Sequence, residues 1–364
     1  MIDFRYHLVS IVAIFLALAV GIVLGTTLLQ GPAVKSIEEV TAGLTASNDE
    51  LRAQIDTLRG REAANDQFII SSTADLVAGD LTGQRVLLVE SPGSSNAVRE
   101  ASEQVLDQAG AEVSGRVALS EKFFDPKTKG VLDGLVNQLK PVNMVFPATA
   151  TSWDRAAALL AATLVTTDQA QGGTPNPATA DVLSTFEAGG LLTAEGDPVK
   201  RATLVVMFAP ERAYEGENAE TQAGAIVSVA DGLDVGSQGA VLAGMADPAA
   251  SPGDAISAVR DEGEVSKRVS TVDTADMPVG RVAIVYSLRE QTSGRAGQYG
   301  VGKGASAPVP AVTSATPSPH DHVRELTCLP AGPVACCTPS PAPRSAPWPP
   351  APPTRRSPAT GPPT

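Results

Sequence analysis

The sequence predicts an α/β protein attached to a membrane. An N-terminal transmembrane helix and a short coiled-coil helix precede a three-layer domain with a mostly parallel sheet, and a disordered proline-rich tail follows. Three observations carry this prediction: an uncharged apolar run near the N-terminus, an apolar repeat of seven residues after it, and short apolar runs that alternate with amphipathic segments in the body. The expected divisions are an anchor, a helical stalk, an α/β domain and a tail, at residues 1–33, 34–65, 66–305 and 306–364.

The apolar run from Leu8 to Leu29 contains no charged side chain. At a rise of about 1.5 Å per residue, a helix of this length crosses a hydrocarbon core of roughly 30 Å. A signal peptide cleaved near Ala19 is the alternative, but its apolar core would span only about 7–15 residues. We therefore expect an uncleaved single-pass anchor. Because Arg5 and the terminal amine precede it, and basic flanks stay cytoplasmic, the bulk of the chain is expected to be extracytoplasmic, in the cell envelope.

One face of the predicted span consists of small residues. Alanine or glycine recurs there every four residues, at Ala13, Ala17, Gly21 and Gly25. Small residues at this spacing let two helix backbones approach closely in lipid, so we expect this face to associate in a homo-oligomer. The alternative is that the pattern reflects only how common glycine and alanine are in membrane helices.

A second helix is expected after a break at Gly31-Pro32, starting at Ser36, which stands three residues before Glu39 as in a capping box. Its apolar residues recur every seven positions, at Ile37, Leu44, Leu51 and Leu58. Such a repeat on a charged helix predicts a short coiled coil, although Thr41, Gly43 and Asn48 weaken it. The alternative is a solvated helix that packs on its own domain.

The body opens with a βαβ pattern. Residues 85–90 form a compact apolar run, as expected for a buried strand, and the turn Ser91 to Ser95 leads into a helix at 96–108 and a strand at 113–119. Further helices are expected at 131–139, 153–165, 180–187 and 221–233 and from 254, and further strands at 142–146, 202–208, 240–243, 269–272 and 280–288. Alternating strands and helices indicate a mostly parallel sheet covered on both faces.

Composition argues against several classes of function. The formal net charge of -13 does not suit nucleic-acid binding. The only histidine before the tail is His7, and the three cysteines, Cys328, Cys336 and Cys337, all lie near the C-terminus. A nucleophile in the body would therefore lack the usual histidine base, and no spacing of carboxylates singles out an acid/base pair. We expect no enzyme and no cofactor.

Two segments of the body could bind a ligand or pack closely. The turn from Ser91 to Ser95 joins a strand to a helix and could receive a phosphate, but it has one glycine and no Walker lysine, so a simple connection is favoured. The glycine-rich stretch from Gly294 to Gly304 follows Ser270-Thr-Val-Asp273 in sequence. It predicts either a loop in close backbone contact with another group or a flexible surface segment.

The tail differs from the rest of the chain. Fifteen of the 29 prolines lie between Ala311 and Thr364, and such a segment cannot bury a core and should be disordered. It also holds a group of soft ligands that would suit copper or zinc: His320, His322, Cys328, Cys336 and Cys337. Because the segment has low complexity, we do not assign the metal ligands to it, and they stay unknown.

Several stretches resemble a known family. They are MIDFRYHLVSIVAIFLALAVGIVLG at 1–25, STVD at 270–273, GRVAIVYSL at 280–288 and GQYGVGKG at 297–304. Together they resemble the actinobacterial family named for the mycobacterial copper transport outer membrane protein. The resemblance implies copper handling at the cell envelope, with copper as a transported ion, and it covers roughly residues 1–310. It implies no ligand set, and the tail departs from it.

The sequence leaves more than one function open. The first is copper efflux or homeostasis by an anchored oligomer, which the resemblance implies could form a pore. The second is a non-transporting envelope scaffold whose coil and domain bind protein partners. The third is a nucleotide- or phosphate-binding enzyme at Ser91 to Ser95.

Overall fold

The computed structural model describes residues 4–249 and 251–311, with side chains given for 5–25 and from 39 onward. The helices are α1 Phe4–Val77, α2 Asn96–Gln108, α3 Glu121–Phe124, α4 Lys129–Leu139, α5 Ser152–Leu164, α6 Thr179–Ala188, α7 Ala219–Gly236, α8 Ala255–Asp261 and α9 Pro278–Gln291, with short 3-10 turns at Pro126–Thr128 and Gln169–Gln171. The strands are β1 Arg85–Glu90, β2 Glu112–Leu119, β3 Leu192–Gly196, β4 Leu204–Phe208, β5 Ala240–Ala243, β6 Ser270–Val272 and β7 Gln298–Tyr299.

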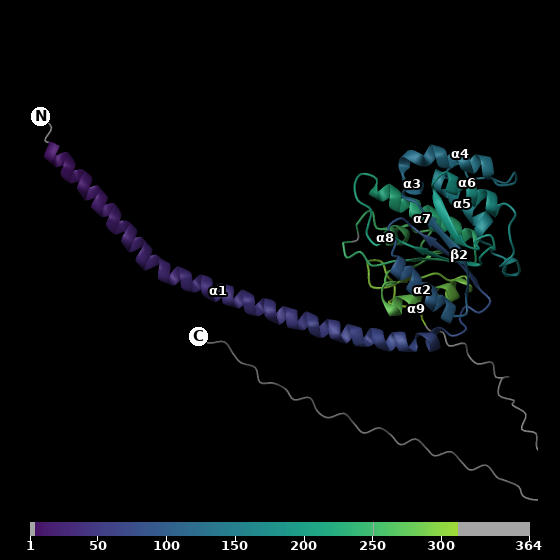
Figure 1. Ribbon diagram of the computed structural model, residues 1–364, viewed down its shortest axis with the longest axis horizontal. Coiled ribbons are helices and arrows are strands. Elements are labelled where there is room, and N and C mark those ends of the chain that lie inside the picture. Colours follow the sequence, from purple (N-terminus) through teal and green to yellow (C-terminus); the bar gives the residue numbers. More distant parts are fainter. Residues whose placement is uncertain (1–3, 250, 312–364) are drawn as a thin grey trace, which may run out of the picture. The chain divides into compact units, whose positions relative to one another are not determined.

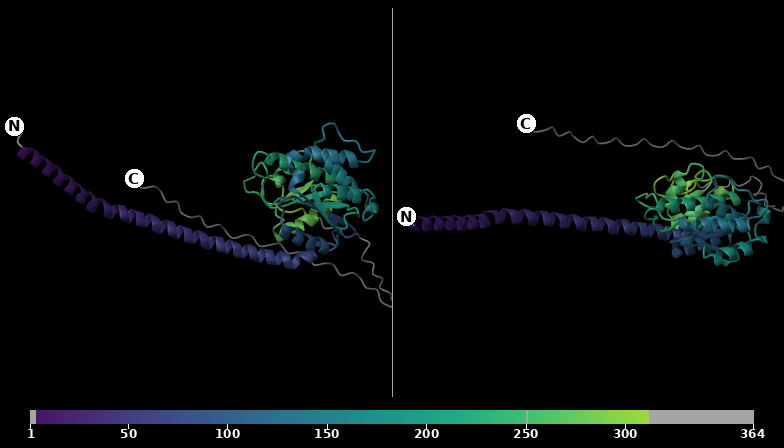
Figure 2. Two further views of the ribbon diagram at one scale, coloured as in Figure 1. Left: turned by 45° about the horizontal axis from the view of Figure 1, so that its top comes forward. Right: turned by 90° about the horizontal axis from the view of Figure 1, so that it is seen from above.

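The seven strands form one sheet in the order β3-β2-β1-β4-β5-β6-β7. Every neighbouring pair is parallel except β2 and β3. Figures 1 and 2 show helices on both sides of this sheet, with α4, α5 and α6 opposite α2 and α9. The three-layer α/β domain with a mostly parallel sheet is therefore confirmed.

Two cores lie on the two faces of the sheet. Because strand side chains alternate between faces, Leu87 and Val89 of β1 belong to the core under α3 to α8, and Val86 and Leu88 to the core under α2 and α9. All four are buried. Central strands buried on both faces read as unbroken apolar runs, which is why β1, β4 and β5 could be recognised from sequence.

The segment at 280–288, which we expected to be a strand, is part of helix α9. An apolar run of nine residues does not distinguish a buried helix from a buried strand. This helix is buried nearly all round, since it lies between the sheet, α2 and the end of α1, so its sequence lacks an amphipathic period. Pro278 at the first helical position is the signal that indicates a helix start.

Other differences concern short elements. The strand expected at 142–146 is absent, because this stretch is a turn between α4 and α5 and two of its valines are exposed. The sequence did not predict the four-residue helix α3, the antiparallel edge strand β3 or the two-residue β7. The remaining elements lie within a few residues of their expected positions.

Helix α1 shows no break at Gly31-Pro32, where we expected the membrane helix to end. Proline lacks one backbone donor and opposes the helix by about 3 kcal/mol, yet the backbone stays helical from Phe4 to Val77. Figures 1 and 2 show α1 as one uninterrupted ribbon. The division between anchor and stalk is therefore not marked by a change of secondary structure.

The C-terminal end of α1 is part of the body. Val77 is buried in the core with α9, the Tyr286 hydroxyl donates to the Leu76 carbonyl at 2.9 Å, and Arg289 pairs with Asp80 at 2.9 Å. At the other end, Ser306 donates its backbone N–H to the Gln298 carbonyl, so the body extends beyond residue 305. Most of the expected tail, residues 312–364, lies outside the described residues.

Asp234, at the end of α7, is a buried carboxylate. Burial raises its pKa from 3.8 to about 6, although the Ala240 amide donates to it and Arg268 lies nearby. In the unfolded chain this carboxyl ionises with the lower pKa of 3.8. The ionised carboxylate therefore lowers the free energy of unfolding at a pH above both pKa values, and this loss of stability disappears below about pH 4. Asp234→Asn, which keeps an oxygen for the Ala240 amide, is expected to raise the free energy of unfolding by about 2 kcal/mol at pH 8.

Urea unfolding at pH 4 and pH 8, followed by the fluorescence of the buried Trp153, measures this difference. The higher free energy of unfolding of Asp234→Asn should be present at pH 8 and absent at pH 4. The exposed Asp107→Asn on α2 is the matched control, with little change at either pH. An equal effect of Asp234→Asn at both pH values would contradict the assignment.

Candidate functional site

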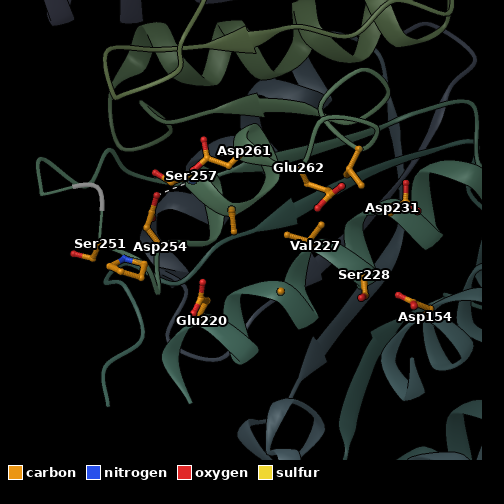
Figure 3. A pocket seen from close by; sticks show the side chains of 14 residues that line it. Asp154, Glu220, Val227, Ser228, Asp231, Ser251, Asp254, Ser257, Asp261 and Glu262 are labelled. Carbon is orange, nitrogen blue, oxygen red and sulfur yellow. Dashed lines mark hydrogen bonds between the residues drawn. The ribbon is translucent and has the colours of Figure 1, made fainter. Parts of the chain in front are cut away.

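A large hollow on the body lies between α7, α8 and the start of α5, and it is acidic (Figure 3). It has a volume of about 680 Å³. Figure 3 shows carboxylates facing it from all three helices. They are Asp154, Glu220, Asp231, Asp254, Asp261 and Glu262.

Half of these carboxylates have local structural roles. Asp254 caps α8 by accepting the Ser257 amide at 2.8 Å, and Asp154 forms a capping box at the start of α5. Asp231 pairs with Arg268. Caps and ion pairs of this kind stabilise helices and do not require a ligand.

The hollow does not fit copper. Its polar lining consists of carboxylates and serines, whereas copper favours thiolate, thioether or imidazole ligands. Within residues 4–249 and 251–311, no three His, Cys, Asp or Glu side chains are placed to hold one metal ion. The possible soft ligands of the tail, His320, His322, Cys328, Cys336 and Cys337, lie outside the described residues.

The position where α/β sheets usually bind ligands is nearly closed here. Such sites lie at the carboxyl ends of the strands where the strand order reverses, which is between β1 and β4 in this sheet. The Ser91 amide donates to the Phe208 carbonyl, and the Glu211 amide donates to the Gly93 carbonyl. The cavity that Ser95 and Val98 line beside this turn has a volume of about 10 Å³, whereas small-molecule sites need roughly 300 Å³ or more. The turn from Ser91 to Ser95 is a connection without room for a nucleotide.

Beside this turn lies a charged network that the sequence analysis missed. Glu90, at the end of β1, is buried. Its carboxylate forms ion pairs with Arg99 of α2 at 2.6 Å and with Arg116 of β2 at 3.3 Å. Arg116 also pairs with Glu195 of the antiparallel strand β3. The network joins α2 to three adjacent strands and neutralises its own charges, so we assign it a structural role.

Two of the stretches that carry the family resemblance meet around one carboxylate. Asp273 follows β6, and its side chain is 1% exposed. The amides of Val301 and Gly302 donate to its two oxygens at 2.8 and 2.9 Å. Gly300 has a φ of +128°, and a Cβ there would overlap the carboxylate. The expected close backbone contact of the glycine-rich stretch is therefore confirmed, and Asp273 is the group that it contacts.

Arg260 of α8 completes this arrangement. Its side chain is 4% exposed and pairs with Asp273 at 2.7 Å. It also donates to the Thr271 hydroxyl and to the carbonyls of Tyr299 and Lys303, at 2.8 to 2.9 Å. One guanidinium thus ties α8 to β6 and to the C-terminal loop. Arg260 and Asp273 have their hydrogen-bond partners within the protein. We therefore assign this cluster a structural role, in holding the C-terminal loop on the sheet, and not a role in binding a substrate.

The residues that we expected to associate lie on the surface of α1. Residues 5–25 form a span with a mean hydropathy of 2.9, none of it buried, which supports a membrane-type helix. Ala13, Ala17 and Gly21 are exposed and Gly25 is half-exposed, and their use in self-association stays a prediction. Of the coil residues, Leu44, Leu51 and Leu58 are exposed, and their pairing in a coil stays a prediction. The Ile37 side chain lies outside the described residues.

Comparison with known proteins agrees with the resemblance read from the sequence. The model of the family described as copper transport outer membrane protein, MctB, matches residues 1–310. The protein named copper transporter MctB from Mycobacterium tuberculosis is 28% identical over 314 residues, which cover 84% of this chain and 98% of that protein. The proteins of the same name from Mycobacterium bovis and Mycobacterium leprae are also 28% identical, with the same coverage. The chain therefore belongs to the family of MctB copper transport outer membrane proteins.

Proposed function

We propose that this chain lowers cell copper by efflux through the cell envelope, acting as a membrane-anchored oligomer with copper as its transported ion. The observation that carries the proposal is the match of the family model across the anchor, the stalk and the body, residues 1–310. Relatives that bear the name copper transporter are similar over nearly their whole length. The family description names the outer membrane; the location proposed for this chain is the cell envelope.

More than one copy is needed for transport in this proposal. One apolar helix, the span at residues 5–25, encloses no path for an ion. The small-residue face, defined as Ala13, Ala17, Gly21 and Gly25, offers a surface for contact between spans in lipid. Arg5 precedes the span, which favours a cytoplasmic N-terminus and an extracytoplasmic body.

Deleting the gene is expected to raise cell copper under copper stress, because efflux would be lost. Elemental mass spectrometry of washed cells measures the metal, with zinc measured in parallel as the control ion. Expression of the full chain should restore the lower copper level, whereas a chain that lacks residues 1–30 should not. Unchanged copper in the deletion strain would refute the proposal.

A scaffold that binds protein partners is the second candidate, and one surface feature favours it. Val142 and Val145, between α4 and α5, are 106% and 86% exposed. Conductance of the purified chain in planar bilayers, with and without residues 1–30, separates the two candidates. Transport predicts discrete channel currents that need residues 1–30, and a scaffold predicts none.

A further inference from the structure

We propose that the stalk docks on a second copy of this chain as a parallel, in-register, two-stranded coiled coil over residues 41–62, with Asn48 of one copy facing Asn48 of the other. The inference rests on the anchored oligomer proposed above and deepens it by naming the partner, the number of strands and their direction.

The surface that carries the inference is an exposed apolar stripe on α1. Leu44, Leu51 and Leu58 are 63%, 55% and 59% exposed, and Ile55 is 45% exposed. All four lie on one uninterrupted helix, and nothing else in the part of the chain that the structure describes covers them. Aliphatic side chains that recur every seven residues on a charged helix are buried from water only when a partner helix packs against them.

The stripe fits the heptad of a dimer. With Leu44, Leu51 and Leu58 at the d positions, the a positions between these leucines hold Asn48 and Ile55, and the outer a positions hold the polar residues Thr41 and Glu62. Leucine at d with a β-branched residue at a favours two strands, and a single asparagine at an a position fixes register and strand number at a cost in stability. Asn48, which weakens the repeat when it is read as an apolar pattern, thus becomes the feature that specifies the pairing.

The flanking charges agree with a parallel direction. In a parallel pair each g residue faces the e residue five positions later in the other copy, which brings Gln54 to Arg59 within the coil and Arg61 to Asp66 just beyond its end. The second pair joins opposite charges, and no pair joins like charges. In an antiparallel pair e residues face e residues, so Arg52 and Arg59 would meet across the interface, which is unfavourable. A span at the N-terminus of each copy also requires that both enter the membrane in the same direction.

Disulfide cross-linking of the full chain in detergent tests the inference. In a background with Cys328→Ser, Cys336→Ser and Cys337→Ser, the variants Leu44→Cys, Leu51→Cys and Leu58→Cys are oxidised with diamide. Each is expected to give a covalent dimer as the major product, because equivalent d positions meet in an in-register pair. The matched controls Ala46→Cys and Ala53→Cys lie on the opposite face of the helix and should give less than about a tenth of that yield.

The alternative occupants give different results. An antiparallel pair would link at most one of the three leucine positions, and docking on lipid or on another protein would link none; either result overturns the inference. A mass in detergent above that of a dimer would overturn the number of strands. The double variant Leu51→Asp with Leu58→Asp should run as a monomer while the Trp153 unfolding transition of the body is unchanged.

Copper measurements keep this inference separate from the proposed function. Cross-links at all three leucines in a chain whose deletion leaves cell copper unchanged would uphold the dimer and refute efflux. Absence of cross-links in a chain that restores copper export would refute the dimer alone.

Discussion

Replacing Arg260 by alanine is expected to lower the free energy of unfolding of the body by about 3–5 kcal/mol, because it leaves a buried charge without its partner. Asp273 would keep only the two amides of the C-terminal loop. The carbonyls of Tyr299 and Lys303 and the Thr271 hydroxyl would lose their donor at the same time. The loop that follows β7 should therefore detach before the rest of the sheet unfolds.

Urea unfolding of the full chain in detergent, followed by Trp153 fluorescence, measures the change. Lys267→Ala is the matched control, since Lys267 pairs with Glu264 on the surface and both side chains are largely exposed; its effect should stay within about 0.5 kcal/mol. Adding Asp273→Asn to Arg260→Ala should recover part of the loss, because the uncompensated charge is then removed. An unfolding midpoint of Arg260→Ala equal to that of the unsubstituted chain would show that the pair of Arg260 and Asp273 does not stabilise the body.

Much of the fold could be predicted because buried parallel strands have a distinctive pattern. Apolar runs of four or five residues in β1, β4 and β5, separated by helical segments, leave few architectures other than a covered parallel sheet. The strand β3 could not be found in this way, because it is an edge strand with only one buried position, Leu192, at its start. Its pairing depends on contact with β2 and not on its own sequence.

Helix α9 illustrates the opposite problem. Its residues 282 to 288 are all buried, so tertiary packing removes the period of 3.6 on which helix recognition depends. Length and the leading proline were the remaining signals. The same stretch was informative in another way, because its residues carry the family resemblance whatever its secondary structure.

The site shows which interactions a sequence can reveal. A glycine-rich stretch predicts close backbone contact, but its partner Asp273 lies 28 residues before Val301 and meets it only because β6 and β7 are neighbours in the sheet. The network of Glu90, Arg99 and Arg116 depends in the same way on strand register. By contrast, the apolar stripe of the stalk is periodic along one helix, so it could be predicted from sequence alone.

Gly280→Ala is expected to lower the free energy of unfolding by about 3 kcal/mol or more, at the top of the range for overpacking a core. Gly280 lies in the first turn of α9, and a Cβ there would overlap the backbone carbonyl of Thr274. That carbonyl accepts the Met277 amide at 2.9 Å, so it is part of the turn that leads into the helix. A backbone group held in this way cannot move aside as a flexible side chain can, and the whole entry to α9 would have to shift.

Gly224→Ala in α7 provides the matched control, because a Cβ at Gly224 meets no atom within 4 Å. Alanine in an open helical position stabilises by roughly 0.5–1 kcal/mol relative to glycine, so the same substitution should change stability in opposite directions in the two helices. Urea unfolding of both variants compares the signs directly. Stabilisation of the chain by Gly280→Ala would mean that the close approach of α9 to Thr274 is not rigid. In that case the family stretch at 280–288 would require another explanation for its first glycine.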